Sequence, residues 1–176
     1  MTEAEIKMYV DIATLVVLTF TLVVVLWQAF LIRRTLEADT FASIEERAEG
    51  IGLSESTDLV NSLTCSNYAT YEATVSPPDQ ARVRKLVDFL NDVSHLARAG
   101  YINDYYPIRL YAPAILTCGR KLLPWWVDGL RAKRSYKFLY NNFVFFYKYA
   151  EYWERHHYPK KGYRWYLRRV EHVAEL

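Results

Sequence analysis

Cysteine is scarce in this chain, which has only Cys65 and Cys118 among its 176 residues. Two cysteines form at most one bridge, so the sequence excludes the disulfide framework that holds small secreted domains together. The sequence also contains no Asn-x-Ser/Thr acceptor for N-glycosylation. Both features are typical of a chain whose folded part lies in a reducing cytosol.

Glycine and histidine are too few and too scattered to form common catalytic motifs. The six glycines make neither a G-x-G-x-x-G nor a Walker phosphate loop, and no serine lies in a G-x-S-x-G elbow. No two of the four histidines are four residues apart, and the adjacent His156 and His157 would point about 100° apart on a helix. Cys118 lies in no nucleophile motif and is interpreted as a small buried thiol. We therefore predict no cofactor and no metal site, and we identify no small-molecule substrate.

Strand patterns are nearly absent, because no alternating run of β-branched residues is bounded by a hairpin turn. Charge is missing from residues 12–32, which form an uncharged run of 21 residues. As a helix this run is about 31 Å long, close to the thickness of the hydrocarbon core of a bilayer. Three hydroxyls within the run can bond back to the helix backbone, those of Thr14, Thr19 and Thr21. The sequence predicts one transmembrane helix over residues 12–32.

Two other interpretations fit this run less well. A cleaved signal peptide would have a basic leader and a shorter apolar core. Here the leader is acidic, with Glu3, Glu5 and Asp11 against Lys7, and arginines occupy the cleavage region. A buried core helix of a soluble protein would usually keep a polar face. An uncleaved anchor is therefore the preferred interpretation.

The charges beside the run predict its orientation. Arg33 and Arg34 follow it directly, and cytoplasmic flanks of membrane helices are enriched in basic residues. Tyr9 and Trp27 lie toward its two ends and are predicted to anchor it at the interfaces. We expect residues 1–11 to form a short extracytoplasmic tail and the C-terminus to be cytoplasmic.

The remainder is predicted to be a helical bundle, so the fold class is all-α with one N-terminal transmembrane helix and a cytosolic helical bundle. A juxtamembrane helix over 33–52 is expected to prolong the span, and a cytosolic helical domain to occupy 53–176. Within that domain, Pro124 is expected at the start of a helix and Pro113 to kink or end the preceding one. Helices are expected at residues 54–71, 79–99, 135–157 and 163–175.

Residues 79–99 give the clearest helical pattern. Gly100 is expected at the position after the helix end. One face of this helix is expected to be apolar. The face opposite to it carries Asp88, Asp92 and His95 at spacings of four and three residues. Two carboxylates and an imidazole suit a general base or part of a metal site, but they are also typical of any hydrated helix face. The apolar face is expected to comprise Val83, Leu86, Val87, Leu90, Val93, Ser94 and Ala97.

Aromatic residues are concentrated between 136 and 166, which hold 14 of the chain's 28. A helix over 135–157 would carry one apolar face and a second set of aromatic side chains beside it. Three interpretations stay open: a central helix buried on all sides, a face that contacts a partner chain, or contact with the bilayer surface. The candidate interaction residues are Phe138, Phe145, Tyr149 and Tyr152.

The charge is divided along the chain. Residues 35–130 have a net charge of −5 and residues 131–176 a net charge of +7. Basic residues near aromatic rings suit contact with lipid headgroups or with nucleic-acid phosphates, although no nucleic-acid module is evident and that partner is disfavoured. The candidate anion or lipid contacts are Lys160, Lys161, Arg164, Arg168 and Arg169.

The layout resembles a bacterial family of small single-span, membrane-anchored helical proteins of unknown function. The resemblance rests on the span ending in Arg33-Arg34-Thr35, a helix through Phe41, the stretch DFLNDVSHLARAGYIND and the later WW pair. It implies a protein of the bacterial inner membrane, sometimes in mobile or phage-linked contexts. It assigns no active residues.

These observations lead to three functional hypotheses. The preferred one is a non-enzymatic membrane protein whose cytosolic helical domain acts as an interaction or scaffolding module, docking a protein partner or its own copies. The alternative is a module that binds lipid headgroups or nucleic acid through the basic C-terminal tail, in a phage-related or defence context. The third is an enzyme centred on Asp88, Asp92 and His95.

Overall fold

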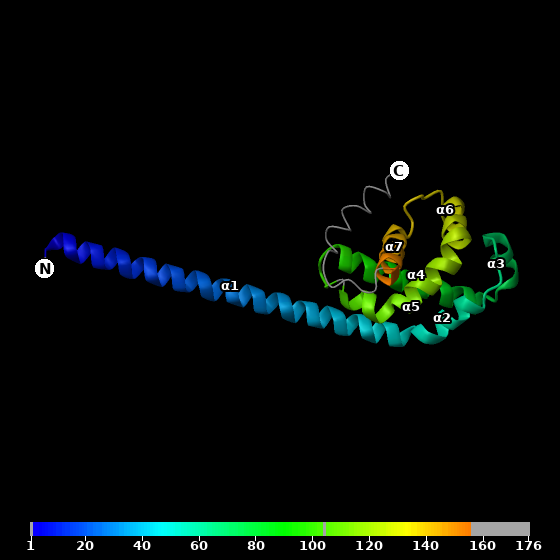
Figure 1. Cartoon of the computed structure of the whole chain (residues 1–176), viewed down its shortest axis with the longest axis horizontal. Coiled ribbons are helices and arrows are strands. Elements are labelled where there is room, and N and C mark those ends of the chain that lie inside the picture. Colours follow the sequence, from blue (N-terminus) through cyan, green and yellow to red (C-terminus); the bar gives the residue numbers. More distant parts are fainter. Residues whose placement is uncertain (1, 104, 156–176) are drawn as a thin grey trace. The chain divides into compact units, whose positions relative to one another are not determined.

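The structure is a computed structural model that describes residues 2–103 and 105–155. The chain divides into two units, Met1–Phe41 and Ala42–Leu176. Both are helical, and the described residues contain no strand. The predicted all-α class is confirmed, with one long apolar helix followed by a helical region (Figure 1).

The first unit is formed by helix α1, which runs from Glu3 to Gly50 and contributes its last turns to the second unit. The hydroxyls of Thr14, Thr19 and Thr21 each donate to the backbone carbonyl four residues earlier, at 2.8 Å. This back-bonding satisfies the polar groups of the apolar run within the helix itself. The sequence-based expectation for these hydroxyls is confirmed.

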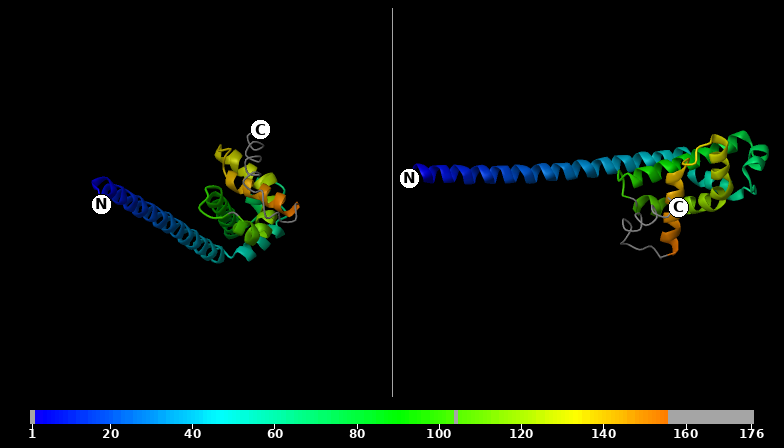
Figure 2. Two further views of the ribbon diagram at one scale, coloured as in Figure 1. Left: turned by 60° about the vertical axis from the view of Figure 1, so that its left-hand side comes forward. Right: turned by 90° about the horizontal axis from the view of Figure 1, so that it is seen from above.

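The second unit is a bundle of helices built on α4 and α5 (Figures 1 and 2). Helices α2 and α7 each pack against both of these central helices. Ile44 and Ala48, in the last turns of α1, are buried in the core of this unit. The elements of the second unit are α2 (Leu53–Ser62), α3 (Tyr68–Thr74), α4 (Pro77–Arg98), α5 (Tyr105–Leu122), the π-helix η1 (Leu123–Val127), α6 (Asp128–Arg134) and α7 (Asn141–Arg155).

Helix α4 is well specified by its sequence. Ser76 caps its N-terminus by accepting a hydrogen bond from the backbone N–H of Asp79, and prolines occupy the first turn. After the helix ends at Arg98, Gly100 has a φ of 79°, a conformation in which glycine carries no steric penalty. All seven predicted apolar-face residues are buried. Phe89, which the predicted face omits, is buried as well.

The single helix expected over 54–71 is wrong, because α2 and α3 replace it. Helix α2 ends at Ser62, and Leu63 is already extended. Asn67 starts α3 by accepting a hydrogen bond from the backbone N–H of Thr70 at 2.8 Å. An asparagine side chain that satisfies the first free N–H groups favours a new helix start over continuation of the old helix.

Pro113 and Pro124 both lie within continuous helical segments. Pro113 lies inside α5, which continues to Leu122. Because proline has no N–H, the backbone carbonyl of Arg109, four residues before Pro113, loses its helical hydrogen bond. Arg109 is exposed, so water can take the place of the missing donor. Pro124 occupies the first turn of a helical segment, as the sequence predicts, although no break separates this segment from α5. It lies in the π-helical turn η1, through which α5 continues into α6.

The helix expected over 135–157 is wrong at its start, since α7 begins only at Asn141. Ser135 and Tyr140 both adopt positive φ, 52° and 60°, and neither conformation continues a right-handed helix. The side chain of Arg131 fixes the connection by donating to the carbonyl of Leu139 at 2.9 Å and to Asn141 Oδ1 at 2.9 Å. Residues 136–140 therefore form a hydrogen-bonded turn.

Candidate functional site

The apolar segment of α1 is exposed at every position except Val24, which is partly buried. Its large side chains include Leu18 at 62% and Phe20 at 69% of their full exposure. Among the described residues, α1 is the one helix that is long and apolar enough to cross a bilayer, and none of its most apolar stretch is buried. A water-soluble core helix with this composition would be covered by the protein. The two predicted interfacial aromatic residues, Tyr9 and Trp27, are exposed. The guanidinium carbon of Arg34 lies over the ring of Phe30, 5.3 Å from the ring centroid.

The four candidate interaction residues lie in two different environments. Phe145 and Tyr149 on α7 are buried, with 7% and 6% exposed. Tyr152 is partly buried, and Phe138 lies outside the helix with 55% exposed. The four side chains do not form one exposed helical face. Two exposed aromatic side chains, Tyr136 and Phe138, lie in the turn before α7.

This turn displays two rings side by side. The rings of Tyr136 and Phe138 meet edge to face with their centroids 6.3 Å apart, and the ammonium group of Lys137 lies 5.1 Å from the Phe138 ring. Tyr136 is 55% exposed. We call Arg134, Tyr136, Lys137 and Phe138 the cationic-aromatic loop. All four are exposed, and neither Arg134 nor Lys137 forms an ion pair with the part of the chain that the structure describes.

Sequence reasoning placed Tyr136 and Phe138 on a helix and so missed the loop. Two signals mark its ends. Arg131, Lys133 and Arg134 are the cations preferred in a last helical turn. Asn141 and Asn142 are residues typical of a helix start.

Asp88, Asp92 and His95 keep the common face of α4 that the sequence predicts, but other contacts engage the two carboxylates. Asp88 accepts a 2.7 Å hydrogen bond from the hydroxyl of Tyr140. Asp92 forms an ion pair with Arg47 at 2.8 Å. His95 is exposed. These contacts join α4 to the turn before α7 and to the last turns of α1, so they support the interpretation of a structural, hydrated face. Across residues 2–103 and 105–155, no group of three histidine, cysteine or carboxylate side chains is arranged to hold a metal ion.

The two cysteines are free thiols in different surroundings. Cys118 is fully buried in the core on α5, as the sequence predicts. Burial raises the pKa of its thiol from the usual 9.0 to about 12. A thiol held protonated in this way is a poor nucleophile, so the geometry gives Cys118 a packing role. Cys65 is partly buried, and its Sγ lies 3.7 Å from the hydroxyl of Thr74.

The pKa of Cys118 predicts alkaline destabilisation. Below pH 9 the Cys118 thiol holds its proton in both the folded and the unfolded chain, so this group does not lower the free energy of unfolding. Above pH 9 the unfolded chain loses this proton while the folded chain keeps it until about pH 12, which favours unfolding. We expect the free energy of unfolding to fall by about 1.4 kcal/mol per pH unit from this group alone.

Denaturant titrations of the full chain at a series of alkaline pH values would measure this slope. Cys118→Ala should make the decline shallower, and Cys65→Ala is the control for the removal of a thiol. Burial also raises the pKa of Tyr71 from 10.0 to about 12, so a further decline is expected above pH 10 in both variants. Equal slopes in the Cys118→Ala variant and the parent chain would contradict the assignment.

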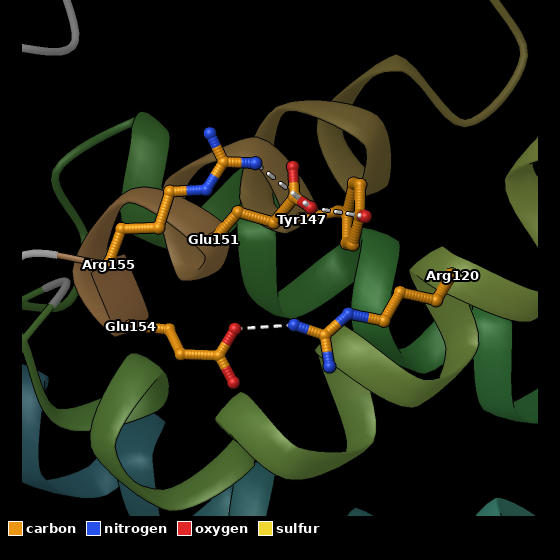
Figure 3. Close-up of polar contacts among 5 residues, drawn as sticks. All are labelled: Arg120, Tyr147, Glu151, Glu154 and Arg155. Atoms are coloured by element: carbon orange, nitrogen blue, oxygen red, sulfur yellow. Dashed lines mark hydrogen bonds and ion pairs between the residues drawn. The ribbon is translucent and has the colours of Figure 1, made fainter.

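A cluster of polar side chains joins α5 to α7 (Figure 3). Arg120 on α5 forms an ion pair with Glu154, and Tyr147 donates a 2.6 Å hydrogen bond to Glu151, which is also paired with Arg155. Burial, followed by the hydrogen bond to Glu151, raises the pKa of Tyr147 to about 12. Each carboxylate in the cluster has a cationic partner. Because the Arg120–Glu154 pair is half exposed, it contributes only about 0.2–1 kcal/mol, and the cluster has the character of a structural link.

Several predicted residues lie outside the described residues. These are the basic candidates Lys160, Lys161, Arg164, Arg168 and Arg169, the expected helix over 163–175, and the histidines His156, His157 and His172. The lipid and nucleic-acid alternatives that rest on the basic tail stay predictions.

Comparison of the chain with protein-family models, with curated proteins and with solved structures finds no match. The class of protein is therefore defined by its own features, which are an all-α fold and one exposed helix apolar enough to span a bilayer.

Proposed function

We propose that this chain is a single-pass membrane protein whose helical domain acts as an interaction or scaffolding module. The observation that carries the proposal is the exposed apolar stretch of α1, whose backbone and hydroxyl groups are satisfied within the helix. Such a helix meets the requirement of the hydrocarbon core, where no water is present to satisfy polar groups. Arg33 and Arg34 favour a cytoplasmic position for the residues that follow, in a bacterial inner membrane.

The interaction role is supported by the cationic-aromatic loop. Exposed aromatic rings beside an arginine are typical of contact surfaces between proteins. The carboxylates of the enzyme hypothesis are engaged in contacts between helices, so the described residues support interaction over catalysis.

The orientation is tested by fusing a reporter that is active only outside the cytoplasm to each end of the full chain. We expect activity from the N-terminal fusion alone. Activity from the C-terminal fusion alone would contradict the proposed orientation.

The interaction role is tested by detergent solubilisation of native membranes and purification of the full chain through a tag. We expect the chain to elute with further copies of itself or with a second protein. A monomer without any copurifying protein would contradict the proposal.

A further inference from the structure

The cationic-aromatic loop is held in a fixed shape by bonds from the bundle. Besides the two hydrogen bonds from Arg131, the backbone N–H of Tyr136 donates to the carbonyl of Arg131 at 3.1 Å. At the other end of the loop, the buried ring of Tyr140 packs against Trp126, with the ring centroids 5.5 Å apart. The hydroxyl of Tyr140 donates a hydrogen bond to Asp88. A surface that is ordered before binding loses little conformational entropy when it meets a partner.

The same unit carries a surface of opposite charge. Five exposed carboxylates lie on the last turns of α1 and on α2. The one cation in this stretch, Arg47, is already paired with Asp92. None of the five carboxylates has an ion pair within the described ranges. We call these residues the acidic strip: Glu45, Glu46, Glu49, Glu55 and Asp58.

The loop and the strip lie on different sides of the second unit. Helix α2 and helix α7 each pack on α4 and α5. In Figure 1, α2 lies along the lower edge of this unit and the connection between α6 and α7 along its upper edge. Both surfaces are tied to neighbouring turns of α4, since Arg47 pairs with Asp92 and Tyr140 bonds to Asp88.

We propose that copies of this chain associate head to tail, with the cationic-aromatic loop of one copy bound to the acidic strip of the next. The inference rests on the proposed interaction role and names a second copy as the partner. A head-to-tail contact, in which each copy uses its loop on one neighbour and its strip on another, is heterologous and continues into rows or rings. Arg134 and Lys137 pair with the carboxylates, while Tyr136 and Phe138 supply the apolar contact area.

Membrane anchoring strengthens such a contact. Two copies that share a bilayer meet at a high effective concentration, so a surface too small to hold free monomers together is sufficient. Because the charges are exposed, the association weakens as the salt concentration rises.

The test is a charge exchange between two differently tagged full-length copies, expressed together and crosslinked in their native membranes at low salt before solubilisation in a non-ionic detergent. The loop-reversed chain carries R134E and K137E, and the strip-reversed chain carries E45K, E46K and E49K. We expect capture of one tag through the other to fall about tenfold when both copies are loop-reversed or both are strip-reversed, since like charges then face each other. Capture should return when one copy is loop-reversed and the other strip-reversed.

The matched control is the R82E and K85E pair, which reverses two exposed cations on α4 and should leave capture unchanged. Return of capture in the mixed pair also shows that the reversed chains fold. Crosslinked species larger than a dimer are expected for the parent chain, whereas a crosslinked dimer alone would overturn the head-to-tail geometry.

Other results would overturn the inference while leaving the membrane anchor intact. One is capture that the reversals do not change. Another is a monomer that copurifies with a different protein, which would keep the proposed interaction role but remove the second copy as the partner. Loss of binding to anionic vesicles in the loop-reversed chain, without loss of capture, would assign the loop to lipid instead.

Discussion

Gly119→Ala is expected to destabilise the second unit by about 3 kcal/mol, the upper part of the range for overpacking a core. A Cβ at this position on α5 would lie 1.9 Å from a ring carbon of Tyr147 on α7. Three atoms of the ring lie within 2.5 Å of that point, so a small shift of the ring tip does not remove the clash. Helices α5 and α7 would have to move apart, which opens the core between them. Chemical denaturation of the full chain, followed by circular dichroism, measures the loss.

A double-mutant cycle separates this clash from a general effect of alanine. In a Tyr147→Ala background the ring is gone, so Gly119→Ala should cost little, and the two substitutions should show a strong coupling. Gly50→Ala is the matched control, because a Cβ there meets nothing within 4 Å. An equal loss with and without the tyrosine ring would refute the close approach of α5 and α7.

Leu18→Arg combined with Leu22→Arg is expected to prevent membrane insertion. Both side chains are exposed and lie one turn apart in the apolar segment of α1. An arginine near the centre of a membrane helix costs about 2.5–3.5 kcal/mol on insertion scales, so two of them offset much of the apolar gain. We expect the variant to leave the membrane fraction and to be found in the soluble fraction or in aggregates.

Leu36→Arg is the control for this variant. Leu36 is equally exposed, at 61%, but it follows Arg33 and Arg34 and lies outside the predicted span. This chain should stay in the membrane fraction. Retention of the Leu18→Arg, Leu22→Arg chain in membranes would show that the apolar segment is not what holds the protein there.

The sequence predicts α1 and α4 well because their signals are local and agree with each other. In α1 a long uncharged run sets the helix, and each threonine hydroxyl bonds within its own turn. In α4 the cap at Ser76, the apolar spacing and the glycine after the helix all favour the same boundaries. Consistent local signals of this kind specify an element with little help from the rest of the fold.

The misplaced boundaries depend on contacts between distant residues. Residues 135–140 have a helical apolar spacing, but the bonds from Arg131 and the contact of Tyr140 with Asp88 hold them in a turn. A hydrogen bond to a residue 52 positions away is invisible to a local pattern. The predicted second aromatic face depended on the same misplaced boundary, because it assumed a helix that begins at residue 135. Since α7 begins at Asn141, Phe138 lies in the preceding turn, apart from Phe145 and Tyr149.

The central claim is that α1 anchors the chain in a lipid bilayer, and extraction of native membranes with alkaline carbonate tests it most directly. Carbonate removes proteins held by surface charge or by other proteins but not those with a helix in the hydrocarbon core. We predict that the full chain stays with the sedimented membranes and is released only by detergent. A chain that appears in the carbonate supernatant without detergent would contradict the account.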